Sequence, residues 1–524
     1  MNIRRYQKWA KSGLAIMLAG AMMVGTAASG GGMTAQAAET ESSDTVSTQK
    51  AVTSDAASLL FTEKHITSNL TLPTIGASGT TISWKSSNPS VLSNEGKVTR
   101  PKKGAADEEV TLKGTVKMGD YAKARNFTFV VLAESEMGPT KEFALDQVEL
   151  LDDYYLTAQN SDIEFLKKFD NDRLLSRFRE TAGLDTKKIA PYGGWEDGWL
   201  GGHSVGHYLT AIAQAVKATG NADLKEKSKQ LIKGLAECQN KLGTGFIFGA
   251  KIETEGYVEK QFDILEGKTT GKTWVPWYNM HKMLTGLVDT YKYTGNKQAL
   301  EVAKKLGDWI YNRVSKWDAG TQGRVLGTEY GGMNDCLYEL YLCTRDSKHL
   351  EAAHKFDEPN LYKTVAKGGK NCLNGKHANT TIPKFLGALK RYVVLEQTGE
   401  LTKDDEVYLT NVEKFFDIAV TRHAYITGGV SVMEHFRKDN NQDGTRTQTN
   451  CESCCAHNML KMAKELYKVT GDKKYADYYE TTLRNSIMGA VKSESGAAAY
   501  FIPMATGYFK TFGNEDPAKN MFWC

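Results

Sequence analysis

The sequence has no cysteine before Cys238, little net charge, and no long hydrophobic run after residue 28. The late cysteines argue against a disulfide framework, which a large domain with its own core does not need. A net charge of +4 over 524 residues, without a concentrated basic stripe, gives no sign of a nucleic-acid partner. Because no later segment is apolar enough to cross a bilayer, no membrane span is expected in the mature protein.

The first 38 residues have the pattern of a secretion signal. An apolar run of small residues over 13–28 is followed by the small-x-small cleavage site Ala35-Gln36-Ala37. The basic start before this run consists of Arg4, Arg5, Lys8 and Lys11. A membrane anchor is the alternative, but the run is short and rich in glycine. We expect a secreted or cell-surface protein, with residues 39–55 as a linker rich in Ser and Thr.

Residues 56–135 have the pattern of a small all-β domain. Four segments alternate apolar and polar residues, as half-buried strands do, and turn residues separate them. These segments are 66–72, 81–86, 110–118 and 125–132. The stretch SWKSSNPSVLSNEGKVTRP (83–101) resembles the degenerate immunoglobulin-like modules of bacterial cell-surface enzymes, and Trp84 suits a sandwich core. No catalytic constellation is present, so a spacing or attachment role is expected.

Residues 140–524 predict a domain built from helical hairpins. An apolar-periodic helix, a Thr-Gly or similar polar turn and a second helix recur at intervals of roughly fifty to seventy-five residues. The predicted turns are 219–221, 294–296, 344–346, 398–400 and 470–472, and the helices before four of them cover 207–218, 281–293, 382–397 and 456–469. An opening hairpin over 148–181 brings the number to about six. The fold class is therefore mainly α, a closed (α/α)6 toroid after a small immunoglobulin-like sandwich.

The loop before each first helix is polar and rich in glycine or aromatic residues. These loops are WEDGWLGGHSVGH (195–207), WVPWYNMH (274–281), EYGGMND (329–335), KHANTTIPK (376–384) and the stretch 427–455. In a toroid they all lie at one mouth, where a ligand cleft is expected. Aromatic rings that stack on sugar faces, together with His, Asn and Asp that bind hydroxyl groups, favour a carbohydrate ligand. Any single histidine among them is as easily a capping or core residue.

Residues 427–460 carry the strongest chemical signal. Glu434 follows a glycine pair, and Glu452 lies among the thiols of Cys451, Cys454 and Cys455. Thiolate and carboxylate together form a ligand set that zinc takes, and the start of a helix stabilises charged thiolates. A buried cysteine patch, or a disulfide from Cys451, is the alternative. The remaining cysteines, Cys238, Cys336, Cys343 and Cys372, are expected as small buried residues.

The helical region resembles the β-L-arabinofuranosidase superfamily, glycoside hydrolase families 127 and 146, from about residue 148 to the end. The resemblance rests on seven motifs that occur in the same order as in the family. The HANTTIPK and NMLK motifs are more similar to family 146 than to family 127. The motifs are GGHSVGHYL (201–209), PWYNMHKMLTGLVDTYKYTGN (276–296), EYGGMND, KHANTTIPK, GGVSVMEHF (428–436), CESCCAHNMLK (451–461) and the terminal FWC (522–524). The family fold is an (α/α)6 barrel followed by β-sandwich domains.

The resemblance implies a retaining glycosidase with a zinc-bound cysteine nucleophile. It makes Cys524 the nucleophile, Glu434 the general acid/base, and Glu452, Cys454 and Cys524 the zinc ligands. It also implies that His281 and His377 bind the furanose, with His203, His207 and Asp335 as further lining. The expected activity is release of L-arabinose from β-L-arabinofuranosides of plant cell-wall or glycoprotein glycans.

The chain departs from the family pattern after Cys524, where a second cysteine and β-sandwich domains are expected. We therefore expect a truncated form of a longer enzyme, in which Cys451 or Cys455 replaces the missing thiolate only if the geometry allows. One alternative is a carboxylate-based toroid glycosidase or polysaccharide lyase, for example with Asp335 and Glu434. The other is a non-catalytic glycan-binding surface protein, for which the thiol cluster would have no use.

Overall fold

The structure, a computed structural model, describes residues 43–61, 65–66, 69–102, 105–133, 140–196, 198–250, 257–513 and 521–522. The predicted signal peptide (1–38) and the predicted nucleophile Cys524 lie outside the described residues. The chain divides into two compact units, one within the first 131 residues and one that contains the helical region. In the described part of the chain, no helix has the length and hydropathy that a bilayer span requires.

The first unit is a four-stranded sheet with one helix. Its strands lie in the order β1-β4-β3-β2. They are β1 (His65–Ile66), β2 (Thr81–Ser86), β3 (Glu108–Met118) and β4 (Tyr121–Val131). Because side chains alternate along a strand, Val110, Leu112 and Val116 of β3 face one side of the sheet, and all three are fully buried. The predicted strands over 81–86 and 110–118 are confirmed.

A helix replaces most of the predicted linker. Helix α1 (Ser43–Ser58) occupies most of the residues that we expected to form a linker. Val52 and Ala56, four residues apart on α1, pack with Ile82 and Val116 of the sheet. Within the described residues of this unit, the second layer of the expected sandwich consists of α1 and a loop rather than a second sheet.

The second unit consists of paired helices, as predicted. Among the described residues six hairpins follow one another, and the shorter helices α6 (Lys260–Leu265), α9 (Ala319–Leu326) and α12 (Pro359–Ala366) lie in their connections. The pairs are α2 (Asp153–Lys167) with α3 (Asn171–Thr181), α4 (His203–Thr219) with α5 (Ala222–Leu242), α7 (Pro276–Thr294) with α8 (Lys297–Val314), α10 (Met333–Thr344) with α11 (Ser347–His354), α13 (Ala378–Thr398) with α14 (Glu406–His423), and α15 (Ser453–Thr470) with α16 (Lys473–Thr482).

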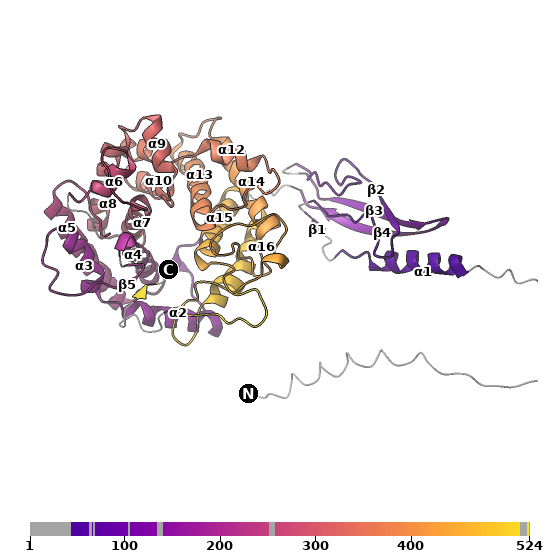
Figure 1. Ribbon diagram of the computed structural model, residues 1–524, viewed down its shortest axis with the longest axis horizontal. Helices are drawn as coiled ribbons and strands as arrows, with labels where there is room; N and C mark the ends of the chain where they lie inside the picture. Colours follow the sequence, from indigo (N-terminus) through magenta and orange to yellow (C-terminus); the bar gives the residue numbers. More distant parts are fainter. Residues whose placement is uncertain are drawn as a thin grey trace, which may run out of the picture. The chain divides into compact units, whose positions relative to one another are not determined.

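These hairpins form a ring (Figure 1), with α4, α7, α10, α13 and α15 packed in that order along its inner side. The ring closes where α2 meets the segment after α16. There the Arg484 guanidinium donates to the Tyr155 hydroxyl at 3.0 Å, and the Ser161 hydroxyl donates to the Ser493 carbonyl at 2.5 Å. The expected (α/α)6 toroid is confirmed.

The turns within the hairpins behave as their composition predicts. The first helix of four pairs ends at a glycine in the left-handed conformation, for example Gly220 at φ 70°. The next residue then often caps the second helix, as Asn221 does by accepting from the Leu224 N–H. Arg345 takes the left-handed position in the fourth turn, at φ 57°.

Candidate active site

Several predicted site histidines lie in or directly before the first turns of inner helices. Helix α4 begins at His203 rather than 207, α7 at Pro276 rather than 281, and α13 directly after His377 rather than at 382. The predicted starts were late because the residues before α4 and α7 are Gly202 and Val275, which are not side-chain caps. Regular helical backbone therefore sets the positions of histidines that we had assigned to loops.

Close packing of α4 against α7 brings two of these helices together. A side chain at Gly206 would meet the Lys282 carbonyl oxygen at 2.1 Å, so only glycine permits this approach. The ring centroids of His203 and His207 lie 6.0 Å apart, and Tyr278 lies about equally far from His203 and from His281, at 6.1 and 6.2 Å. The predicted sugar-binding histidines of these two helices thus form one group.

A buried carboxylate holds His203. Glu196 accepts from the N–H groups of Gly202 at 2.7 Å and Ser204 at 2.8 Å, and it lies 3.3 Å from Nδ1 of His203. That same nitrogen lies 2.8 Å from the Leu200 carbonyl, so it carries the proton. Burial alone would raise the pKa of Glu196, but the imidazole and the two N–H groups lower it.

His281 has unused hydrogen-bonding capacity. Its side chain is buried, and its Nδ1 has no hydrogen-bond partner among the described residues. The loop before α10 reaches it at Gly331, where a Cβ would lie 2.4 Å from Nδ1. Burial and the Lys282 ammonium hold the pKa of His281 well below its usual value, so the imidazole is neutral. A buried, unsatisfied imidazole at this position suits a ligand that supplies the missing partner.

Solvent reaches the inside of the ring. His207 on α4 and His457 on α15 are both exposed, although their helices belong to the inner layer. They lie near enough to interact electrostatically, and burial of their surroundings lowers the pKa of both, to about 4 for His457. An opening within the ring is therefore lined by side chains that solvent reaches, although protein surrounds them on most sides.

Glu434 lies in a strained loop and contacts His377. Its carboxylate is 3.1 Å from Nε2 of His377, and its other oxygen accepts from the Tyr500 hydroxyl. Ser431, Met433 and Glu434 have φ values of 89°, 46° and 64°, which side chains rarely adopt. Strained backbone of this kind collects at functional sites, where the surrounding structure must maintain it.

The pair shares a proton. The hydrogen bond from His377 lowers the pKa of Glu434, and burial opposes it only in part. Burial would lower the pKa of His377, but the Glu434 hydrogen bond and the charges of Glu329 and Glu452 raise it above its usual value. The Glu329 carboxylate lies 3.4 Å from Nδ1 of the same ring. Both shifts favour a proton on the imidazole beside an ionised Glu434.

The thiol cluster is divided by the start of α15. Glu452 precedes the helix at its N-cap position and is fully buried, and the Cys455 thiol donates to its carboxylate at 3.1 Å. Cys454 lies in the first turn. The Cys451 thiol faces Thr427 instead, 3.7 Å from its hydroxyl, and burial raises its pKa to about 12. Cys455 rather than Cys451 is therefore the further thiol that adjoins the predicted zinc ligands.

Asp335 lies in the first turn of α10, where it is ion-paired. Its carboxylate is 3.2 Å from the Lys461 ammonium and its side chain is almost completely buried. Among the other cysteines of the described residues, Cys238 and Cys336 are buried as predicted, whereas Cys343 and Cys372 are half-buried. Cys524 lies outside these residues. Strand β6 (Met521–Phe522), shortly before it in the sequence, pairs with β5 (Gly193–Gly194) in the loop that leads to α4.

Sequence reasoning missed Glu329 and Tyr500 as partners of His377 and Glu434. Glu329 opens the EYGGMND motif, in which only Asp335 was chosen. Tyr500 lies beyond the last hairpin in a segment without periodic pattern, so no local signal connects it to Glu434.

Comparison with known proteins identifies the families of both parts of the chain. Residues 147–524 match the profile of the β-L-arabinofuranosidase GH127 catalytic domain, and residues 43–134 match the atrophied bacterial immunoglobulin domain. The chain belongs to glycoside hydrolase family 127. The match covers most of the sequence, but it does not separate family 127 from family 146, so nearness to the latter stays a prediction.

Two solved structures are similar to this family 127 chain. One, described as a GH127 β-arabinofuranosidase, has a TM-score of 0.51 and 18% identity and is aligned over 73% of this chain and 60% of its own. Another, a GH127 β-L-arabinofuranosidase from Geobacillus stearothermophilus T6, has a TM-score of 0.47, 18% identity, and coverage of 69% and 56%. This chain thus spans about three fifths of the length of these structures. No curated protein matches the chain.

Proposed function

We propose that this chain is the catalytic part of an exported, zinc-dependent retaining β-L-arabinofuranosidase that releases L-arabinose from plant glycans. The observation that carries the proposal is the pairing of Glu434 with His377 in a strained loop, next to the buried Glu452 and its neighbouring thiol. His377 interacts electrostatically with both carboxylates, so the two groups belong to one site.

The residues present fit a zinc ion. A fully buried carboxylate beside thiols is a donor set of the type that zinc binds. Glu452 and Cys454 would hold the ion together with Cys524, and Cys455 lies close enough to Glu452 to contribute. When bound, zinc would keep a cysteine sulfur deprotonated and fix its direction.

Different residues of the chain would then perform the separate steps of the reaction. A retaining hydrolase needs a nucleophile and an acid/base on opposite sides of the anomeric carbon. We assign Cys524 as the nucleophile and Glu434 as the acid/base. The proton for the leaving oxygen comes from the His377–Glu434 pair, and the ionised Glu434 then accepts a proton from the attacking water. His281, His203 and His207, which can both donate and accept when neutral, suit the sugar hydroxyls.

The carboxylate-only alternative is weaker in this structure. Asp335 would need to act as a second catalytic carboxylate, but the Lys461 ammonium holds it in a buried ion pair. A purely binding protein gains nothing from the strained Glu434 loop, which costs about 1–3 kcal/mol per residue.

The test uses the purified full-length chain with aryl β-L-arabinofuranosides and zinc analysis. Glu434→Gln should lower kcat on a poor leaving group roughly 10²–10⁴-fold, and much less on an activated aryl group that needs no proton. Cys524→Ser should abolish turnover with both substrates. Glu480→Gln, an exposed carboxylate on α16, is the control and should change neither rate. Zinc-free protein that releases no arabinose from any β-L-arabinofuranoside would disprove the proposal.

A further inference from the structure

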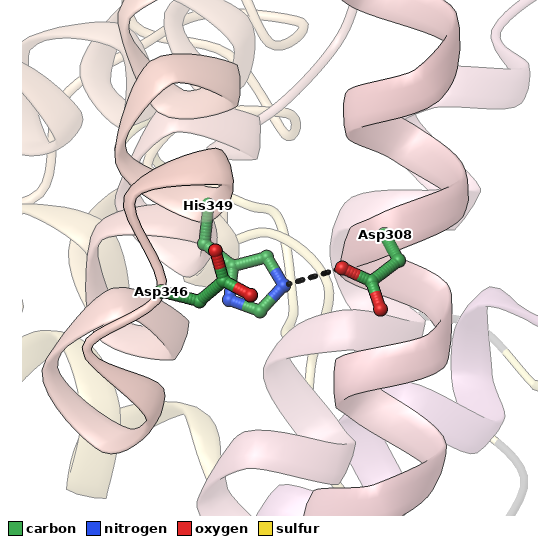
Figure 2. A group of neighbouring side chains, drawn as sticks. All are labelled: Asp308, Asp346 and His349. Atoms are coloured by element: carbon green, nitrogen blue, oxygen red, sulfur yellow. Dashed lines mark ion pairs between the residues drawn. The ribbon is translucent and has the colours of Figure 1, made fainter.

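A second group of metal-binding side chains lies between α8 and the turn from α10 to α11. It consists of Asp308 on α8, Asp346 at the N-cap of α11, and His349 within α11 (Figure 2). One potential ligand atom from each residue lies within 4.8 Å of the other two. None of the three was selected from the sequence, and none belongs to the proposed catalytic site.

The hydrogen bonds of His349 permit the tautomer that a metal ligand needs. When the Thr344 hydroxyl donates to the Leu340 carbonyl at 3.0 Å, its oxygen accepts from Nδ1 of His349, 2.8 Å away. In this arrangement the proton is on Nδ1, and Nε2 presents its lone pair. A histidine whose first nitrogen is held in this way by an outer hydrogen bond has the arrangement of a metal ligand.

The free lone pair is buried and aimed at a carboxylate. His349 has no exposed surface, and its Nε2 has no hydrogen-bond partner among the described residues. It faces Oδ1 of Asp308 at 3.7 Å, and that oxygen also lacks a hydrogen bond. Helix α8 admits the ring at Gly307, where a Cβ would lie 2.7 Å from Nε2. In the tautomer with the proton on Nδ1, the lone pairs of Nε2 and Oδ1 face each other and repel unless a cation lies between them.

We propose that Asp308, Asp346 and His349 bind a divalent transition-metal ion of the zinc class, which fastens α8 to the α10–α11 turn. A separation of 3.7 Å is too long for a hydrogen bond, but it suits two ligands about 2.1 Å from a shared ion. One imidazole and two carboxylates favour zinc over magnesium or calcium, which prefer oxygen ligands alone.

The surroundings of the site permit binding. Asp308 and Asp346 are partly exposed, so an ion can enter. Two groups oppose binding. The Lys304 carbonyl favours the protonated imidazole, so an ion must displace that proton. The Lys348 ammonium lies 3.8 Å from Asp308, but its side chain is half-exposed and can turn into solvent.

This site is separate from the proposed catalytic centre. Asp335 lies in the first turn of α10 and Asp346 just beyond its last, so about 16 Å along the helix axis separates them. The ion would therefore stabilise the ring without taking part in catalysis. The inference does not depend on the proposed function.

The test compares zinc content and thermal unfolding of the untagged full-length chain and three single variants. Asp308→Asn should contain about one equivalent of zinc less than the parent, and added zinc should raise its Tm by several degrees less. Glu301→Gln removes another carboxylate from α8 and should match the parent. Glu452→Gln should lose the catalytic equivalent but keep the Tm response of this site.

Equal zinc content and equal Tm response in the parent and in Asp308→Asn would overturn the inference. Because Asp308 is half-exposed, this variant should fold, which circular dichroism can check. If it does not fold, the Glu452→Gln variant still decides: the inference is wrong if that folded protein shows no zinc-dependent rise in Tm. Loss of zinc from Glu452→Gln alone would concern only the catalytic proposal.

Discussion

Gly206→Ala should both destabilise the ring and weaken the candidate active site. The added methyl would meet the Lys282 carbonyl oxygen at 2.1 Å, the carbonyl carbon at 2.3 Å and the Met283 nitrogen at 2.9 Å. All three are backbone atoms of α7, so no side chain can move aside. The methyl would lie more than an ångström inside ordinary van der Waals contact, and α4 and α7 must separate.

The magnitude follows from two opposing effects. Alanine is about 1 kcal/mol more favourable than glycine inside a helix, whereas overpacking against backbone typically costs 1–3 kcal/mol and occasionally more. We expect a net loss of about 1–3 kcal/mol in the free energy of unfolding, because a clash with fixed helix backbone belongs at the severe end of the range. Separation of α4 from α7 also moves His203 and His207 relative to His281, so kcat/KM should fall at least tenfold.

Urea unfolding followed by circular dichroism, with arabinose release measured on the folded variant, tests both effects. Gly323→Ala is the matched control, since Gly323 lies within α9 and a Cβ there meets no atom within 4 Å. That variant should be up to about 1 kcal/mol more stable and fully active. If the unfolding midpoint of Gly206→Ala equals or exceeds that of the parent, the close crossing of α4 and α7 does not constrain the site.

Three further predictions concern protons and zinc. Because the pKa of His377 is raised, kcat/KM should fall as pH rises through a value above 6.5, and His377→Asn should remove this alkaline limb. Tyr500→Phe removes a hydrogen bond that stabilises ionised Glu434, so the acidic limb of the same profile should move to higher pH. Glu452→Gln should reduce bound zinc, measured by mass spectrometry, whereas Cys451→Ser should leave it unchanged because that thiol is buried against Thr427 and stays protonated.

Periodic signals in the sequence predicted the ring well. Three of the four Thr-Gly turns combine a glycine in the left-handed conformation with a following side chain that caps the next helix, and both signals are local. The start of α4 was harder to predict. Gly202 takes φ 90° before it and offers no side-chain cap, while the capping carboxylate comes from Glu196, six residues earlier. A cap supplied from outside the helix leaves no pattern next to its first turn.

Candidate site residues were easiest to choose where the chemistry is concentrated in a segment with a clear motif. Glu434 and Glu452 lie in a single motif-rich stretch, and both were chosen. Tyr500 and Glu329 reach the same site from segments 66 residues after and 105 residues before Glu434 in the printed sequence. Helix α1 was missed for a related reason: its apolar residues Val52 and Ala56 are few, and they become meaningful only when the sheet that they cover is known.

The hydrogen bonds around Glu434 explain how a strained loop can position an acid/base. The carbonyl of Glu434 accepts from the Ala378 N–H at 2.6 Å, and the Phe436 N–H donates to the Lys376 carbonyl at 2.9 Å. Met433 is held from the other side by the Thr449 carbonyl at 2.8 Å. These bonds join the loop to the backbone that starts α13, so His377 and Glu434 move as one unit. The left-handed residues thus direct the carboxylate toward an imidazole that the same bonds keep in place, and little reorganisation remains when a sugar binds.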